Sequence, residues 1–140
     1  MKKKIFGILL ICVLVLGLTG CGSSGEKYDK NDPYVEYIEL ARAQKTGTIT
    51  DNKTYGELLD AILPDAKWTH YTGYLGNANE EAISCKGKNK NTSEEINVIF
   101  VVNLNHENVS VGKYFVNGEE KVNYNLYDLL KEGFEELKKE

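Results

Sequence analysis

Two residues in the middle of the chain, Cys85 and His70, supply the thiol and the imidazole that nucleophilic catalysis requires. They lie in segments of alternating polarity, residues 67–75 and 80–87, that are predicted to pair as neighbouring strands. An imidazole beside a thiol can activate it as a nucleophile. Cys85 shares its strand face with Ile83, however, and a buried thiol usually acts as a small apolar side chain. A small hydrolase-like enzyme with a nonstandard site near His70 and Cys85 is therefore the alternative, not the leading hypothesis.

The rest of the sequence contains no further catalytic or metal-binding pattern. The second histidine, His106, falls in a predicted turn, and neither histidine has partners at the spacing typical of zinc ligands. A serine nucleophile elbow, a phosphate-binding loop and a dinucleotide fingerprint are all missing from the sequence. Adjacent glutamates at turns and strand ends are expected to face solvent. The sequence thus predicts no catalytic residue, no metal and no cofactor.

Aromatic and amide side chains form the second group of candidate site residues. Trp68, Tyr71 and Tyr74 fall on or beside the first predicted strand, and Asn97 and Asn103 share one face of the longest strand. Tyrosine and tryptophan provide a large contact area at low entropic cost, which suits binding surfaces. If these side chains lie on an open sheet face, they predict a surface for a glycan, a peptide or a protein. The alternative is that the aromatic rings fill the core between the sheet and the helices.

The N-terminus carries a targeting pattern. Residues 2–4 are lysines, and residues 5–18 form an apolar run that is typical of a secretory signal and shorter than the roughly 20 residues of a membrane-spanning helix. The run ends in Leu18-Thr19-Gly20-Cys21, which resembles the lipobox of bacterial lipoproteins. The resemblance implies that residues 1–20 are a cleaved signal peptide and that the sulfur of Cys21 carries a diacylglycerol. An ordinary cleaved signal or an uncleaved anchor is the alternative.

Lipid attachment at Cys21 would place the protein at the cell membrane, on its extracytoplasmic face. One acyl chain anchors weakly, at about 0.8 kcal/mol per buried methylene, whereas two chains hold stably. Residues 21–32 are rich in glycine and serine and then charged, so we expect a lipid-anchored flexible tether. A folded N-terminal strand is the alternative for this segment. Residues 33–140 are predicted to form a single domain.

Charge and cysteine content narrow the classes of partner and of fold. Without residues 2–4 the chain has 14 basic residues against 21 acidic ones, a formal charge of about −7. This balance argues against nucleic acid and against electrostatic docking on anionic lipid. Of the three cysteines, Cys12 would leave with the signal and the sulfur of Cys21 would be acylated, so Cys85 is expected to have no partner for an intramolecular disulfide. The domain must therefore be held together by its apolar core.

Hydrophobic periodicity predicts an α+β domain. Helices are expected from Pro33 to residue 46 and over residues 55–63, the second opened by a capping box of Thr54 and Glu57. After Pro64 the period changes to two, and a final helix is expected to follow a cap at Asn125. Strands are predicted over residues 67–75, 80–87, 95–105, 109–116 and 119–122. Short turns make consecutive strands antiparallel, so we expect an antiparallel sheet of four to five strands with two N-terminal helices and one C-terminal helix.

The segment KTYGELLDAILPDAKW, residues 53–68, carries a second resemblance. It is similar to a segment of small uncharacterised membrane-attached proteins of Gram-positive bacteria, in which a Thr-x-Gly-Glu helix leads to a tryptophan-bearing strand. Thr54, Gly56, Glu57 and Trp68 carry the likeness, which implies a fold and no activity. The leading hypothesis is a lipid-anchored, extracytoplasmic, non-catalytic binding module for an envelope protein, peptide or glycan. A structural or inhibitory envelope protein is a further alternative.

Overall fold

The computed structural model describes residues 26–73, 79–122 and 124–139 of the 140-residue chain. Two helices come first, α1 (Val35–Ala43) and α2 (Tyr55–Ile62), with the short 3-10 helix η2 (Thr48–Thr50) between them. Five strands follow: β1 (Lys67–Tyr71), β2 (Glu80–Lys88), β3 (Glu95–Asn103), β4 (Asn108–Val116) and β5 (Glu119–Lys121). The longest helix, α3 (Tyr124–Lys138), comes after β5.

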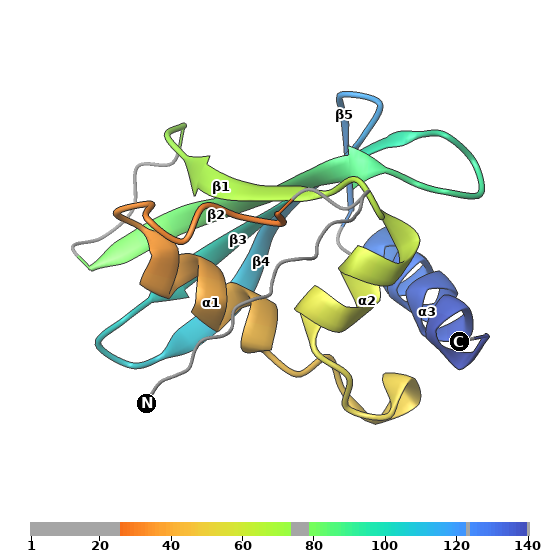
Figure 1. Cartoon of the computed structure of the whole chain (residues 1–140), viewed down its shortest axis with the longest axis horizontal. Helices are drawn as coiled ribbons and strands as arrows, with labels where there is room; N and C mark the ends of the chain where they lie inside the picture. Colours follow the sequence, from red (N-terminus) through yellow and green to blue (C-terminus); the bar gives the residue numbers. More distant parts are fainter. Residues whose placement is uncertain (1–25, 74–78, 123, 140) are drawn as a thin grey trace, which may run out of the picture.

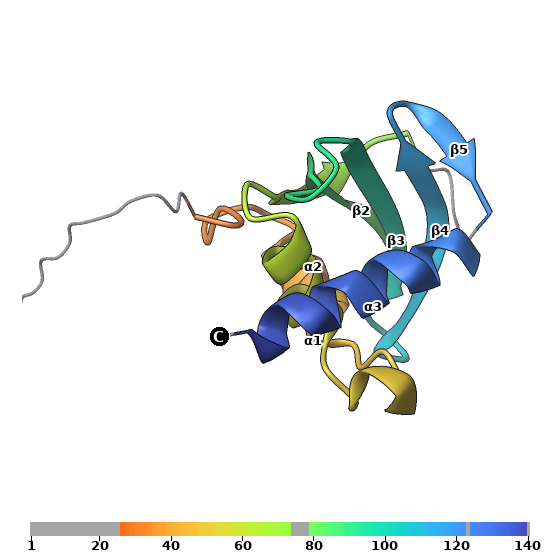
Figure 2. The ribbon, with the colours of Figure 1, turned by 90° about the vertical axis from the view of Figure 1, so that its right-hand side faces the viewer.

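The five strands form one antiparallel sheet in the order of the sequence, β1-β2-β3-β4-β5. All three α-helices lie against the same face of this sheet, which we call the helix face (Figures 1 and 2). The opposite face, the open face, carries none of the described helices. The predicted α+β class is confirmed, with an antiparallel sheet, two N-terminal helices and one C-terminal helix.

The core lies between the helix face and the helices. β3 contributes every second residue to it, and these side chains are almost completely buried because the three helices cover them: Ile96, Val98, Phe100 and Val102. Apolar side chains at helical spacing pack against them from the helices: Leu58, Leu59 and Ile62 of α2, and Leu126, Leu129 and Leu130 of α3. Burial of these apolar side chains is the main favourable term in folding a domain without a disulfide.

The two N-terminal helices begin differently. The Thr54 hydroxyl accepts a hydrogen bond from the Glu57 amide at 3.1 Å, and the Glu57 carboxylate accepts one from the Thr54 amide at 2.9 Å, so the predicted capping box of α2 is confirmed. α1 begins at Val35, two residues after the predicted start at Pro33. Asp32 forms a turn there, because its carboxylate accepts a hydrogen bond from the Tyr34 amide at 2.7 Å. α3 begins at Tyr124, one residue before its predicted cap at Asn125, so Asn125 lies inside the helix.

Residues 26–32 form a strap along β1 (Figure 1, orange). The Lys27 carbonyl accepts a hydrogen bond from the Trp68 amide at 2.8 Å, and the Glu26 carbonyl accepts one from the Lys67 ammonium at 2.6 Å. The Tyr28 ring packs against the core. The structure therefore differs from the expected flexible tether over residues 26–32, because one aromatic ring and these hydrogen bonds offset the entropy lost on ordering a polar segment.

An ion-pair cluster joins the C-terminal part of α3 to the turn between β2 and β3. The Glu136 carboxylate lies 3.0 Å from both Lys90 and Lys139, and the Asn91 amide is 3.5 Å away. Hydrogen bonds from Lys139 and Lys90 lower the pKa of the Glu136 carboxyl to about 2. The carboxylate therefore stays ionised across the range of ordinary pH values, and it holds α3 against the sheet.

The helices α2 and α3 pack backbone to backbone at a glycine. Gly133 is buried, and a Cβ atom at this position would collide with the carbonyl oxygen of Leu58. The close approach of the two helices therefore depends on the missing side chain.

Replacing Gly133 with alanine is expected to lower the free energy of unfolding by about 1–3 kcal/mol, because α3 must move away from α2. Alanine would favour an isolated helix by about 1 kcal/mol, so helix propensity predicts the opposite sign. Urea denaturation measures the difference. Asp128→Ala, at an exposed position of α3, is the matched control and should change the value by less than about 0.5 kcal/mol. A stabilised Gly133→Ala protein would contradict the backbone contact.

Candidate functional site

Cys85 and His70, the candidate nucleophile and base, have separate environments on the helix face. The His70 ring stacks on Tyr34, with centroids 3.6 Å apart and planes 5° from parallel, and its Nε2 lies 2.7 Å from a Glu81 oxygen. Cys85 is fully buried in the core. Burial and the nearby Asp60 raise the pKa of its thiol well above the ordinary value. A protonated and inaccessible thiol is a poor nucleophile, so the geometry does not favour the hydrolase alternative.

Trp68 belongs to the core and not to the predicted binding surface. It is 1% exposed and stacks on Phe100 with ring centroids 5.5 Å apart. Its Nε1 donates a hydrogen bond to Asp60 at 3.4 Å, and the Arg42 guanidinium lies 5.0 Å from the ring centroid. Successive strand residues point to opposite faces, so Trp68 and Tyr71, three residues apart, lie on different faces. The described helices cover the sheet face that carries Trp68, and they leave the face that carries Tyr71 uncovered.

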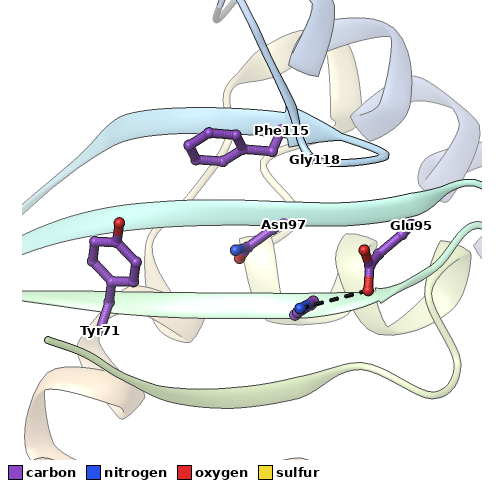
Figure 3. A pocket seen from close by; sticks show the side chains of 6 residues that line it. Tyr71, Glu95, Asn97, Phe115 and Gly118 are labelled. Atoms are coloured by element: carbon purple, nitrogen blue, oxygen red, sulfur yellow. Dashed lines mark ion pairs between the residues drawn. The ribbon is translucent and has the colours of Figure 1, made fainter. Parts of the chain in front are cut away.

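A pocket lies on the open face, and we call it the open-face pocket. It encloses about 150 Å³. Figure 3 shows the side chains of Tyr71 and Phe115 around that of Asn97, with Glu95 farther along the same strand. The lining residues come from four strands and one turn: Tyr71 of β1, Lys86 of β2, Glu95 and Asn97 of β3, Phe115 of β4, and Gly118 of the β4–β5 turn.

The side-chain amide of Asn97 is held by a hydrogen bond from the neighbouring strand, β2. The Ser84 hydroxyl, which is 7% exposed, donates a hydrogen bond to Asn97 Oδ1 at 2.6 Å across the β2–β3 pair. Because Oδ1 accepts this hydrogen bond, Nδ2 is the donor left for the pocket. Among the described residues, none accepts a hydrogen bond from this Nδ2. Asn97 is thus a preoriented hydrogen-bond donor.

A charged pair stands at the rim of the pocket. Lys86 Nζ lies 3.5 Å from Glu95 Oε2, and both side chains are about half exposed. A pair with this separation and exposure contributes little to stability. A ligand can therefore replace either partner of this ion pair at a small cost in free energy. The pair gives the pocket one hydrogen-bond donor and one acceptor, with no net charge.

Phe115 reaches the open face because of a β-bulge. Phe100 pairs with Val111, but the preceding residue, Ile99, pairs with Lys113, so Gly112 is the extra residue in β4. The bulge shifts the following residues by one position. Tyr114 then faces the core, where burial raises its pKa to about 12, and Phe115 faces the pocket. Sequence reasoning missed Phe115, although a lone glycine inside a strand pattern is a signal of a bulge.

The structure brings together two of the predicted surface residues. Tyr71 and Asn97 line the open-face pocket. Asn103 lies on the same face six residues farther along β3, where its Oδ1 accepts a hydrogen bond from the Asn105 amide at 3.0 Å in the next turn. Tyr74 lies outside the described residues. The pocket residues that sequence reasoning did not identify are Lys86, Glu95, Phe115 and Gly118.

No protein-family model, curated protein or solved structure matches this chain. The function must therefore be inferred from its own residues. Over residues 26–73, 79–122 and 124–139, no group of three or more histidine, cysteine, aspartate or glutamate side chains is placed to hold a metal ion. No helix in this described part of the chain has the length and apolarity to cross a membrane.

Cys85 is expected to resist alkylation in the native protein, because its thiol is buried and protonated. Iodoacetamide at pH 8 should leave the peptide that contains Cys85 unmodified, and the same treatment in 6 M guanidinium chloride should modify it. Mass spectrometry of the peptide measures the modification, and the denatured sample is the control. Fast alkylation of the folded protein would instead identify an accessible, reactive thiol.

Proposed function

We propose that this protein is a lipid-anchored, extracytoplasmic binding module whose open sheet face holds an envelope component. The open-face pocket is the observation that carries the proposal. It combines two aromatic rings, a preoriented amide and an exposed ion pair on the one sheet face that no described helix covers. Such a mixture of apolar and directed polar groups suits specific binding.

The charge of the pocket supports an uncharged partner. Lys86 and Glu95 balance each other at its rim, while the chain as a whole is acidic. A polyanion such as nucleic acid would meet a neutral pocket on an acidic domain, without the clustered positive charge that such ligands need. The pocket therefore favours recognition by ring contacts and hydrogen bonds.

The strap supports a position close to the membrane. Cys21 precedes Glu26, the first described residue, by five residues, and a chain of that length spans at most about 18 Å. Because residues 26–32 are bound along β1, a lipid on Cys21 would hold the edge of the sheet within this distance of the headgroups. The partner would then be a membrane-proximal component of the envelope.

Replacing Cys21 with alanine is expected to release the protein from membranes, because the sulfur that carries the acyl chains is lost. Cell fractionation and labelling with radioactive palmitate measure attachment, and mass spectrometry defines the mature N-terminus. Cys85→Ala is the matched control and should keep the label. Palmitate that persists in the Cys21→Ala protein, or an unacylated native terminus, would refute the anchor.

A double variant, Tyr71→Ala with Phe115→Ala, is expected to lose most of its capture of envelope material, because both aromatic walls of the pocket are removed. The full-length protein in mild detergent is used as bait on solubilised envelope, and bound material is quantified. Tyr127→Ala, which removes an exposed ring on α3, is the matched control and should capture normally. Equal capture by the double variant would show that the pocket is not the binding site.

A further inference from the structure

We infer that the open-face pocket takes a saccharide, with one uncharged pyranose ring held by Tyr71 and Phe115 over Asn97. The inference deepens the proposed function and rests on the same pocket. It names the class of ligand, which the proposed function leaves as a protein, a peptide or a glycan.

The backbone around the pocket is closed to an extended peptide. The pocket lies over β1, β2, β3 and β4, and its floor strands β2 and β3 are each paired on both sides; the edge strand β1 contributes the side chain of Tyr71. Peptides that bind sheets usually add a strand at an unpaired edge, where main-chain hydrogen bonds supply the affinity. A ligand in this pocket must be recognised by side chains alone, which disfavours an extended peptide.

The aromatic walls suit a ring with an apolar face. A pyranose ring presents C–H groups on its faces and hydroxyl groups around its edge. The Tyr71 and Phe115 rings are half-buried, so they are partly ordered before binding, and little side-chain entropy is lost on contact. Aromatic rings that stand around a polar residue can pack on the faces of the sugar while its edge stays near the polar group.

The polar groups suit hydroxyl groups or an acetamido group. Asn97 Nδ2 donates, the Glu95 carboxylate accepts, and the Lys86 ammonium donates. A sugar hydroxyl both donates and accepts, so neighbouring hydroxyls can satisfy an amide and a carboxylate together. A phosphate would be attracted by Lys86 and repelled by Glu95, so the pair gives it no net attraction. A purely apolar ligand would bury the Asn97 amide without a partner.

The experiment titrates the full-length protein, labelled with nitrogen-15 in detergent micelles, with soluble probes. Tetra-N-acetylchitotetraose and maltotetraose represent saccharides, and tetra-alanine represents a peptide. At least one saccharide is expected to shift the side-chain amide signals of Asn97 saturably, and tetra-alanine is expected to leave them unchanged. Absence of any saccharide-dependent shift, or an equal shift with tetra-alanine, would overturn the inference.

Variants test the contacts. Tyr71→Ala and Phe115→Ala are each expected to raise the saccharide Kd at least tenfold, while Tyr127→Ala should keep it within twofold. Glu95→Ala changes an exposed side chain, so it tests the pocket without disturbing the core, and it should raise the Kd severalfold. Ser84→Ala should raise it less, because it frees the Asn97 amide to rotate. Unchanged Kd values in Tyr71→Ala and Glu95→Ala would overturn the assignment of the site.

The outcomes separate this inference from the proposed function. If envelope capture depends on Tyr71 and Phe115 but no saccharide shifts the Asn97 signals, the saccharide class is wrong and the binding module stands. If a saccharide binds in the pocket but envelope capture is unaffected by the double variant, the saccharide site stands and the proposed function fails.

Discussion

The register of β3 is the constraint on which both the core and the pocket depend. β3 is hydrogen-bonded to β2 and β4, so its side chains must alternate between the two faces of the sheet. Phe100 and its alternate neighbours pack against the three helices, which leaves Asn97 on the other face. A slip by one residue would expose the apolar set and bury the amide. The burial of the apolar side chains of β3 therefore determines that Asn97 faces the pocket.

The bulge in β4 gives the two halves of the β3–β4 pair different registers. Before Gly112, β4 continues the pairing set by the turn after Asn103, and after it each residue is displaced by one position. The displacement exchanges two neighbouring aromatic residues between the faces. Tyr114 enters the core and Phe115 enters the pocket. A single extra residue therefore decides which ring faces a ligand, which agrees with the use of bulges to redirect side chains at functional sites.

The two faces of the sheet have different roles. The helix face holds Cys85 and Trp68, whose chemical groups serve packing, and the His70 ring, which is stacked on Tyr34 beside the strap. The open face holds the groups that are free to contact a ligand. The strap covers part of the outer edge of β1, where unpaired backbone groups would otherwise invite other chains. It also ties Glu26 to the edge of the sheet, so the proposed anchor at Cys21 and the proposed binding face would be geometrically linked.

The α+β class, the strand order, the capping box at Thr54 and the alternation of β3 could all be predicted from the sequence, because they follow from periods within segments and from the short turns between them. The proposed lipid anchor at Cys21 rests on the sequence alone. Tertiary packing, in contrast, buries Trp68, places Phe115 in the pocket and binds Glu26 and Lys27 along β1. Periodicity tells which residues share a face, but the packing of helices on the sheet decides which face is covered, and hydrogen bonding between strands decides where a register shifts.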